Sequence, residues 1–349
     1  MKALVITEKN KPVELLSVAD RVVGPGQALV RVYAAALNHR DVWIQKGQYA
    51  GLKYPIVPGS DGAGVVVAVS DGGSGGGTAG VRGGSGVAAA RDWIGKEVII
   101  DPALHWGEAA GFQSPTNFKI LGLPDDGTLA EYVVAPLTNL VAKPAHLSFE
   151  EAAALPLAGV TAFRASMTRA QLRAGDRVLI TGIGGGVALF ALQFAVAAGA
   201  KVYVTSGDDE KLSRAMSMGA AGGANYKHSG WVESLRSQAG AYDVIVDGAG
   251  GDGVNELFDL ATPGGRVVFY GATCGNPSSV VLRRIFWKQL NVLGSTMGSP
   301  ADFAAMVEFV GRHGIRPVVD RVFAMEEGEA AFRHMDDAKQ CGKIVIKIK

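Results

Sequence analysis

The stretch RVLITGIGGGVALFALQFAVAAGAKVYVTS, residues 177–206, decides the fold class of this chain. A β-branched segment at 177–182 runs into glycines, an apolar segment with helical spacing fills 187–198, and a second β-branched segment follows at 201–206. A glycine turn between a strand and a helix, inside a unit of 30 residues, is typical of a βαβ unit with parallel strands.

The turn of this unit contains Gly182, Gly184, Gly185 and Gly186, followed by Val187. Glycines let a backbone approach a pyrophosphate closely, and a helix N-terminus offers free N–H groups and a partial positive charge. Four glycines exceed what a tight turn without a ligand requires. The turn therefore predicts a dinucleotide site.

The end of the second strand indicates which dinucleotide is bound. An acidic residue at that position would bond the 2′-hydroxyl of NAD, but this chain has Ser206 there. Serine leaves space for a 2′-phosphate, which Lys211 and Tyr226, with the adjoining Lys227, are able to hold. We predict NADPH over NADH. The alternative is that Asp208 turns back to the ribose and Lys211 is an ordinary surface lysine.

The same alternation continues on the C-terminal side of this unit. Further strands are expected at 224–226, 243–247, 265–270 and 289–295, with helices at 209–218, 231–238 and 252–261. This order predicts an α/β domain with a parallel sheet covered by helices on both faces. Ligands bind at the carboxyl ends of such strands. The residues expected to line the cofactor there are Gly248, Gly250, Tyr270, Gly271 and Ala272.

The N-terminal part is a different structure. Residues 1–145 contain short β-rich segments separated by Gly, Pro and Asp, whose irregular spacing favours a small twisted barrel. Residues 71–90 have the composition of a flexible Gly/Ser insertion. We expect residues 1–145 and 296–349 to form one domain and residues 146–295 to form the cofactor domain, beginning near a capping box at Ser148 and Glu151.

Charge and composition exclude several classes of protein. With 34 Lys plus Arg and 33 Asp plus Glu, the net charge of +1 argues against a dedicated nucleic-acid or membrane-surface protein. Two cysteines cannot form a disulfide framework or a four-cysteine zinc site. No apolar run reaches the length of a membrane span. We therefore expect a soluble protein of the cytoplasm.

Six motifs in this chain resemble one family. They are ALNHRD (36–41), PGSDGAGV (58–65), GTLAEY (127–132), LPLAGVTA (155–162), ITGIGGGVALFALQ (180–193) and GSTMGS (294–299). The chain resembles the medium-chain dehydrogenase/reductases, in particular their zinc-free, quinone-oxidoreductase-like branch. The resemblance implies a GroES-like barrel domain, a Rossmann domain and an active site in the cleft between them. It also implies a homodimer joined through the last strand of each Rossmann sheet, here near 289–295.

The resemblance also bears on metal binding. Zinc-dependent members hold catalytic zinc through a Cys, a His and a third Cys or Asp, with an acid beside the His. Matching positions here are Asn38, Ser60 and Leu157, with Asp61 as the acid. Leucine cannot bind zinc, and amide and hydroxyl groups are poor substitutes for thiolate and imidazole. His39 and His105 remain as isolated histidines, so we expect no metal at either zinc site of the family.

Without a metal, hydride transfer favours acceptors that are already electrophilic, such as quinones and α,β-unsaturated carbonyl compounds. Asn38 is the first candidate for the hydrogen-bond donor to the acceptor, although an Asn at this position could also simply cap a helix. Tyr49 is a second candidate, as proton donor or stacking surface, and Asp41 more plausibly orders the local loop. Thr161 is expected to contact the nicotinamide end of the cofactor.

Other functions stay open on the sequence alone. One sub-case is an enoyl-thioester reductase, for which Arg283 and Arg284 suit an acidic coenzyme tail. The alternatives are a zinc-dependent alcohol dehydrogenase and an NADPH-binding protein with little turnover. Trp43, Trp106 and Trp287 are candidates for a flat apolar pocket, although buried tryptophans usually only pack.

Overall fold

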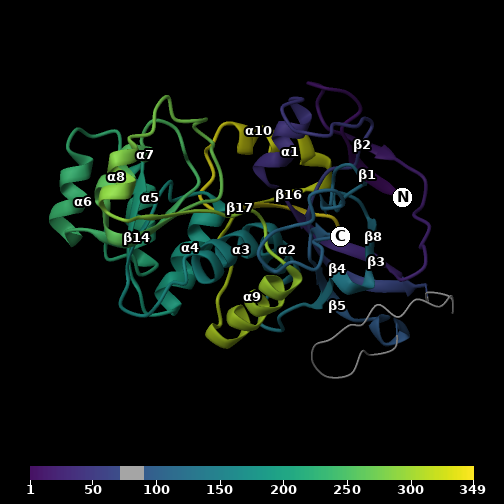
Figure 1. Cartoon of the computed structure of the whole chain (residues 1–349). Helices are drawn as coiled ribbons and strands as arrows, with labels where there is room; N and C mark the ends of the chain where they lie inside the picture. The colour runs from purple at the N-terminus through teal and green to yellow at the C-terminus, as the bar shows by residue number, and fades with distance from the viewer. Residues whose placement is uncertain (71–89) are drawn as a thin grey trace. The chain divides into compact units, whose positions relative to one another are not determined.

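The computed structural model describes residues 1–70 and 90–349, which divide into two compact units (Figure 1). The first unit comprises 1–157, 319–339 and 343–349, and the second comprises 158–318 and 340–342. The expected flexible insertion at 71–90 lies outside the described residues except for Ala90.

The second unit contains a six-stranded sheet in which every neighbouring pair of strands is parallel. The spatial order is β12-β11-β10-β13-β14-β15. The strands are β10 (Arg177–Ile180), β11 (Lys201–Ser206), β12 (Gly222–Asn225), β13 (Tyr242–Asp247), β14 (Ala261–Phe269) and β15 (Asn291–Gly294). The order of strands reverses between β10 and β13, which is where open α/β sheets bind ligands. This is the doubly wound Rossmann arrangement predicted from the glycine turn.

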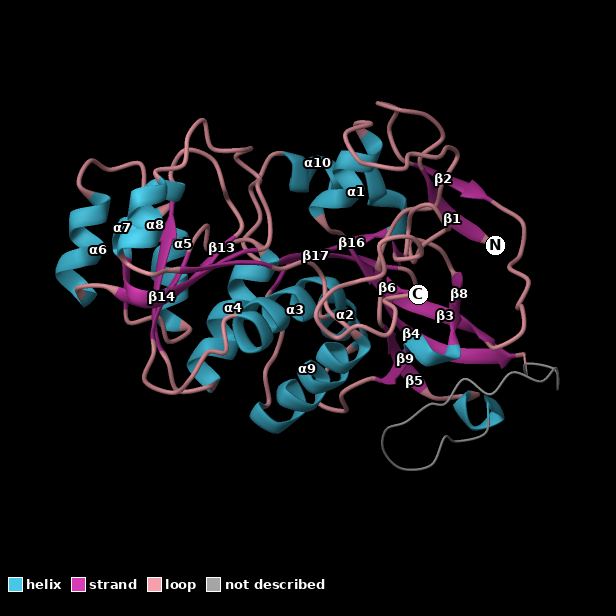
Figure 2. Ribbon diagram, viewed as in Figure 1, coloured by secondary structure: helices cyan, strands magenta, loops and turns pink. Residues whose placement is uncertain are grey.

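Helices and strands alternate along this unit, as the sequence predicts (Figure 2). The helical segments are η3 (a π-helical segment, Arg164–Arg169), α4 (Gly186–Ala197), α5 (Asp209–Ser217), α6 (Trp231–Ala239), α7 (Val254–Leu260), α8 (Leu282–Trp287) and α9 (Pro300–His313). The central strands are buried on both faces, which explains why they are continuous apolar runs. Leu179, Ile245 and Val267 from three neighbouring strands share one core cluster with Leu257 and Phe258 of α7.

Helix α9 belongs to the second unit, whereas we expected residues from 296 onward to return to the first domain. Two sets of contacts explain its position. The ring of Phe309 packs against Phe163 and Phe194 at centroid distances of 5.9 and 5.8 Å. Arg164 also forms a buried ion pair with Asp302 at 2.5 Å. The return to the first unit therefore starts at Val319, after α9.

The first unit contains a mixed seven-stranded sheet in the order β16-β17-β3-β4-β5-β9, with β8 paired to β3. Its strands are β3 (Gln27–Ala36), β4 (Asp61–Val69), β5 (Glu97–Ile100), β8 (Tyr132–Pro136), β9 (Leu140–Ala142), β16 (Val319–Ala324) and β17 (Lys343–Lys347). Two smaller pairs are β1 (Lys2–Val5) with β2 (Glu14–Ser17) and β6 (Ala103–Leu104) with β7 (Lys119–Ile120). The last strand of the chain lies beside β3, so the two ends of the sequence build one sheet.

Short helices complete the first unit. They are α1 (His39–Gln45), α2 (Phe149–Ala154) and α10 (Gly328–Asp336), with 3₁₀ turns η1 (Ala90–Trp93), η2 (Leu137–Asn139) and η4 (Met325–Glu327). Helix α3 (Pro156–Phe163) spans the boundary of the two units at Leu157. The predicted capping box is present at α2, where Ser148 Oγ accepts from Glu151 N and the Glu151 carboxylate accepts from Ser148 N. None of the described helices has the length and apolarity needed to cross a bilayer.

The Arg164–Asp302 pair gives a stability prediction with a defined pH dependence. Burial alone would raise the pKa of Asp302, but hydrogen bonds from Thr168, Ser299 and Arg164 outweigh it and lower that pKa. Asp302→Asn removes the carboxylate charge that pairs with the buried Arg164 guanidinium, which should cost about 3 kcal/mol of unfolding free energy at pH 7. Urea unfolding of both proteins measures this difference.

Because the folded pKa lies below the unfolded value of about 3.9, the stabilisation by Asp302 is complete above that pH. It is lost as the pH falls through the folded pKa, so the two unfolding curves should converge in acid. Glu308→Gln, at an exposed ion pair on the same helix, is the control and should change little. Equal stability of wild type and Asp302→Asn at pH 7 would contradict the assignment.

Candidate functional site

The glycine turn of the second unit leaves room for a ligand in front of its backbone. Gly182 and Gly184 have φ values of +64° and +126°, which side chains disfavour. Gly185 is the N-cap of α4 with an ordinary φ of −72°. A β-carbon at Gly182 would meet no protein atom within 4 Å, and one at Gly185 would meet the carbonyl oxygen of Gly182 at 3.9 Å. Protein packing therefore does not explain the glycine at position 185.

The predicted ribose-recognition residues lie together at the end of β11. Ser206 is buried, and its Oγ accepts a hydrogen bond from Asp208 N at 3.2 Å. The space beside the neighbouring Gly207 is covered by the Tyr226 hydroxyl and Lys227 Cε, at 2.9 and 2.8 Å from a built β-carbon. The Lys211 side chain covers Gly184 of the turn in the same way, at 2.8 Å.

Asp208 is engaged with its own helix. Its Oδ1 accepts from Glu210 N at 2.8 Å and from Lys211 N at 3.3 Å, so the carboxylate caps α5.

The loop after β13 and the loop after β14, both at the carboxyl edge of the sheet, are hydrogen-bonded to each other. Thr273 N and Cys274 N donate to the carbonyl oxygens of Gly248 and Ala249, and Gly251 N donates to Gly275 O at 2.8 Å. The Tyr270 ring lies against Gly248, where a β-carbon would come within 2.5 Å of it. The predicted residues Gly248, Gly250, Tyr270, Gly271 and Ala272 are thus brought together in this pair of loops.

Asp247 ties this pair of loops to the end of β10. One of its oxygens accepts from Thr181 Oγ1 at 2.5 Å, and the other accepts from Gly250 N at 2.8 Å. Burial raises the pKa of Asp247 despite these hydrogen bonds. The contact lies at the β10–β13 junction where the strand order reverses.

The first unit holds a buried polar cluster around Asp61. Lys343 Nζ donates to Leu37 O at 2.7 Å, to Asn38 Oδ1 at 2.7 Å and to Asp61 Oδ2 at 2.9 Å. Asn38 Nδ2 donates to the same Asp61 oxygen at 2.9 Å, and Leu157 N donates to Asp61 Oδ1 at 2.7 Å. Asn38 is the N-cap of α1, where the Asp41 carboxylate accepts from its backbone N–H at 2.8 Å, and its side-chain amide is hydrogen-bonded to Lys343 and Asp61.

A second cation lies next to this cluster. Arg40 Nη1 donates to Ser60 Oγ at 2.6 Å and to Leu121 O at 2.8 Å. Tyr49 lies over the same guanidinium, with its ring centroid 5.0 Å from Arg40 Cζ. Asp41 accepts from Asn38 N and Gly59 N, so it orders the two segments that carry Asn38 and Ser60. Burial raises the pKa of Asp41, although Arg40 and the Asn38 N–H favour its charged form.

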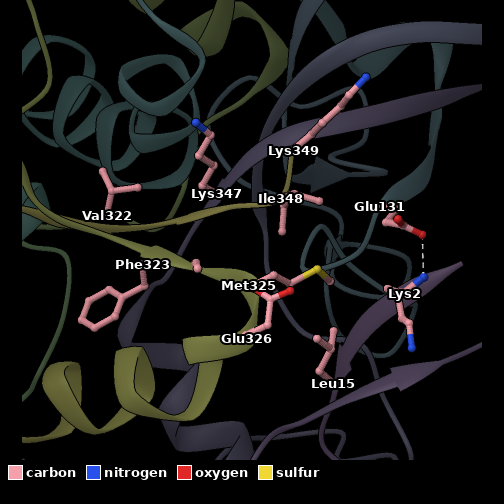
Figure 3. Close-up of a pocket in the computed structure, with 11 residues that line it drawn as sticks. Lys2, Leu15, Glu131, Val322, Phe323, Met325, Glu326, Lys347, Ile348 and Lys349 are labelled. Carbon is pink, nitrogen blue, oxygen red and sulfur yellow. Dashed lines mark hydrogen bonds between the residues drawn. The ribbon is translucent and has the colours of Figure 1, made fainter.

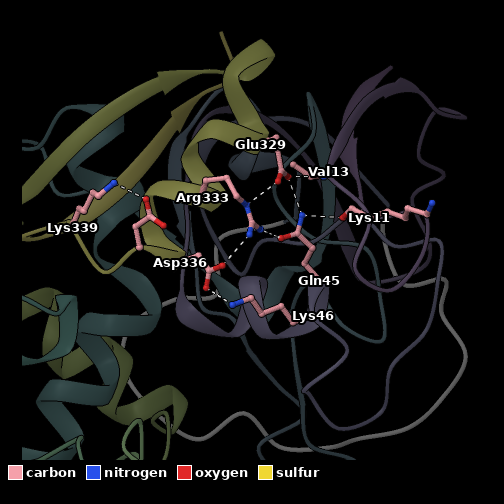
Figure 4. A network of polar contacts seen from close by, with 9 residues as sticks. Lys11, Val13, Gln45, Lys46, Glu329, Arg333, Asp336 and Lys339 are labelled. Carbon is pink, nitrogen blue, oxygen red and sulfur yellow. Dashed lines mark hydrogen bonds and ion pairs between the residues drawn. The ribbon is translucent and has the colours of Figure 1, made fainter.

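Helix α1 is held in place from its other end by a network with α10 (Figure 4). Arg333 contacts Gln45, Glu329 and Asp336, and Lys46 pairs with Asp336. Gln45 Nε2 in turn donates to Glu329 Oε2 at 2.9 Å. These contacts fix the helix whose first residues carry Asn38, Arg40 and Asp41.

The residues at the zinc-ligand positions do not fit zinc. Asn38, Ser60 and Leu157 all come close to Asp61 or its neighbours, so the three positions converge, but they offer an amide, a hydroxyl and an alkyl side chain. The ammonium of Lys343 is hydrogen-bonded to Asn38 and Asp61. His39 and His105 are exposed, and the described chain contains no group of three His, Cys, Asp or Glu side chains suited to a metal ion.

Other predicted residues have mixed environments. Thr161 is buried in α3. Trp106 is buried and donates its indole N–H to Ala109 O, so it packs within its own loop. Trp287 is 74% exposed on α8, where Arg283 stacks over its ring, and Arg284 pairs with Asp259 at 3.2 Å.

A hollow of about 440 Å³ also lies in the first unit, beside the C-terminal residues (Figure 3). Lys2, Glu131, Lys347 and Lys349 line it, together with Phe323 and Met325. None of the residues predicted to bind cofactor or substrate lines this hollow.

Sequence reasoning missed Lys343 and Arg40. The available signal was Lys343, which directly precedes the apolar run Ile344–Ile346 of the last strand, where a buried lysine demands paired acceptors. Arg40 lies within the ALNHRD motif but was not assigned a role.

Comparisons with known proteins give one consistent family. The model of the alcohol dehydrogenase GroES-like domain matches residues 24–145, and the model of the zinc-binding dehydrogenase domain matches residues 186–312. The zinc-type alcohol dehydrogenase-like protein YogA of Leptosphaeria maculans is 35% identical over 97% of this chain and 95% of its own length. Quinone oxidoreductase-like protein 2 of Rattus norvegicus is 26% identical over 100% of this chain and 92% of its own.

Solved structures agree with this result. An NAD-dependent alcohol dehydrogenase is 36% identical, superposes with a TM-score of 0.89 and covers 100% of both chains. The three relatives named here carry names from two substrate classes, alcohols and quinones.

The glycine turn yields a prediction that separates ligand binding from folding. Gly185→Ala has a permitted φ and meets no protein atom closer than 3.9 Å, so it should fold with at most a small loss at the N-cap. If the turn receives a phosphate as predicted, the added methyl group should obstruct it and raise the dissociation constant of reduced nicotinamide dinucleotide by about tenfold or more. Fluorescence titration measures the constant. Gly311→Ala, also in open space, is the control. An unchanged dissociation constant in Gly185→Ala would contradict the prediction that the glycine turn binds the dinucleotide.

Proposed function

Because the chain belongs to the medium-chain dehydrogenase/reductase family, it is an oxidoreductase, and we propose that it transfers hydride from NADPH to a quinone or an α,β-unsaturated carbonyl compound without a metal. The observation that carries this proposal is the cluster of Asn38, Asp61 and Lys343. The positions matching the zinc ligands of zinc-dependent relatives hold Asn38, Ser60 and Leu157, and the ammonium of Lys343 is hydrogen-bonded to Asn38 and to the neighbouring Asp61.

The proposed cofactor is held by the second unit. The glycine turn at 182–186 receives the pyrophosphate, and the loops after β13 and β14 line the rest of the dinucleotide. Ser206, Lys211 and Tyr226, with Lys227, supply a small hydroxyl, a phenol and two cations for a 2′-phosphate. Thr161 is proposed to contact the nicotinamide end. NADPH, when bound, supplies the hydride.

Asn38 is the proposed donor to the acceptor substrate. When a hydride reaches a quinone or the β-carbon of an enone, negative charge develops on a remote oxygen. An amide N–H stabilises that charge without itself losing a proton. Such acceptors need no metal, whereas oxidising a simple alcohol requires removal of its hydroxyl proton, which zinc assists. Tyr49 is the proposed second polar group, and Asp41 has a positioning role.

A second candidate, an NAD-dependent alcohol dehydrogenase, is favoured by the solved structure of that name at 36% identity. Two observations favour the reductase over this candidate. Asn38 and Lys343 are hydrogen-bonded to Asp61 where a zinc-dependent alcohol dehydrogenase would hold its metal, and position 206 is a serine rather than the acidic residue that favours NAD. A third candidate is a dinucleotide-binding protein with little turnover. It would use the same cofactor site but would have no substrate that accepts the hydride.

The test is oxidation of NADPH and NADH, in parallel, with an ortho-quinone and an enone as acceptors. We expect turnover with NADPH. Ser206→Asp should shift the ratio of kcat/KM values toward NADH by about tenfold or more, because its carboxylate repels a 2′-phosphate and accepts from a ribose hydroxyl.

Ser213→Asp, which adds the same charge on an exposed position of α5, is the control and should leave the ratio nearly unchanged. A wild-type preference for NADH would overturn the cofactor assignment. Tight NADPH binding with no turnover of any acceptor would favour the third candidate.

We also propose that two copies associate through β15. This strand is at the edge of its sheet, and no other described strand pairs with its second side. Large apolar side chains are exposed beside it: Leu282 is 66% exposed, Phe286 64% and Trp287 74%. A surface of this kind is typical of an interface.

Light scattering on the eluting protein should give twice the chain mass for the wild type. Val292→Arg, on β15, should give a monomer. Val322→Arg is the control and should stay dimeric, because Val322 lies on β16 of the other unit and is about as exposed as Val292. A monomeric wild type would contradict the proposal.

A further inference from the structure

Lys343 has a hydrogen-bonding environment that leaves it no alternative arrangement. An ammonium group has three N–H donors and no acceptor. In this structure it has three acceptors within 2.9 Å: Leu37 O, Asn38 Oδ1 and Asp61 Oδ2. The side chain is only 4% exposed, so water does not compete for these donors. Burial of a charge is tolerated here because every donor is satisfied.

This arrangement determines which way the Asn38 amide faces. The oxygen and nitrogen of an amide are nearly equal in size, so an Asn side chain can often lie in either of two orientations. Here its oxygen must face the ammonium of Lys343, which only donates, and its nitrogen must face the carboxylate of Asp61, which only accepts. Reversing the amide would place a donor against a donor and an acceptor against an acceptor.

The fixed amide keeps a donor available. Nδ2 has two N–H groups, and within the described residues it makes one hydrogen bond, to Asp61. The second N–H is therefore held on a side chain that cannot turn its oxygen toward a ligand in that place.

The charge of Lys343 matters as well as its geometry. The cluster contains two carboxylates, Asp41 and Asp61, and two cations, Arg40 and Lys343, so its formal charge is balanced. Without the ammonium, a negative charge would remain beside the place where negative charge develops on the acceptor. In a buried setting that repulsion opposes the reaction.

We infer that Lys343 is a positioning residue for the reduction: its buried ammonium fixes the Asn38 amide as a donor and balances the charge of Asp61. This inference rests on the proposed function of Asn38. It assigns to a lysine of the last strand the charge that a metal ion would otherwise bring to these positions.

The test compares three variants. Lys343→Met removes the charge with little change in volume and should lower kcat by at least tenfold while the KM for NADPH stays within twofold. Asp61→Asn/Lys343→Met removes both buried charges, so it should regain much of the unfolding midpoint lost in Lys343→Met. Its kcat should stay low, because neither group then fixes the Asn38 amide. Lys347→Met, on the same strand but exposed, is the matched control and should behave as wild type.

A double-mutant cycle with Asn38→Ala separates this inference from the proposed function. Asn38→Ala alone should lower kcat, and adding Lys343→Met should then lower it by a smaller factor than Lys343→Met does in the wild type, because only the loss of the balancing charge remains. A normal kcat in Asn38→Ala would overturn the donor role proposed for Asn38. A normal kcat in Lys343→Met, or full recovery of kcat together with stability in Asp61→Asn/Lys343→Met, would overturn the inference about Lys343.

A measurement that needs no turnover reads the amide itself. The side-chain NH₂ signal of Asn38 in a ¹⁵N-labelled protein is identified by its loss in Asn38→Ala. Its exchange with solvent should be at least tenfold faster in Asp61→Asn/Lys343→Met than in wild type. Equal exchange rates would show that Lys343 and Asp61 do not hold the amide, whatever the acceptor of the enzyme proves to be.

Discussion

The ammonium of Lys343, enclosed by a carbonyl, an amide and a carboxylate oxygen, is the interaction on which the polar cluster of the first unit depends. A buried charge needs a full set of partners, and these partners come from two separate parts of the sequence: the residues directly after β3 and the start of β4. Lys343 itself begins β17, a third part of the sequence. Satisfying one ammonium therefore brings the two ends of the unit to the same place. The backbone N–H of Leu157 on Asp61 adds the segment that leads out of the unit.

The second unit is organised by backbone geometry rather than by charge. Parallel strands bring their carboxyl ends to one edge, and the glycine turn, the Ser206 region and the two loops after β13 and β14 all lie there. Asp247 links two of these segments through Thr181 and Gly250. We therefore propose different roles for the two units. The second unit binds the phosphates of the cofactor with backbone N–H groups, and the first unit supplies the rigid polar cluster around Asn38.

Much of this could be predicted from the sequence because the signals are local. The 177–206 unit, the strand ends and the capping box at Ser148 each depend on residues close together in the chain, and the structure confirms the Rossmann and GroES-like fold. The position of α9 was not predicted, because the Arg164–Asp302 pair and the contacts of Phe309 join residues more than a hundred positions apart. Lys343 was missed for the same reason, since its partners lie about 300 residues away in the sequence.

The central claim is that this polar cluster, and not a metal ion, surrounds Asn38 in the working protein. The most direct measurement is the zinc content of the purified protein together with its turnover before and after treatment with a chelator. The account predicts far less than one zinc per chain and a turnover that neither chelation nor added zinc changes. One zinc per chain, with activity lost on chelation and restored by zinc, would contradict it.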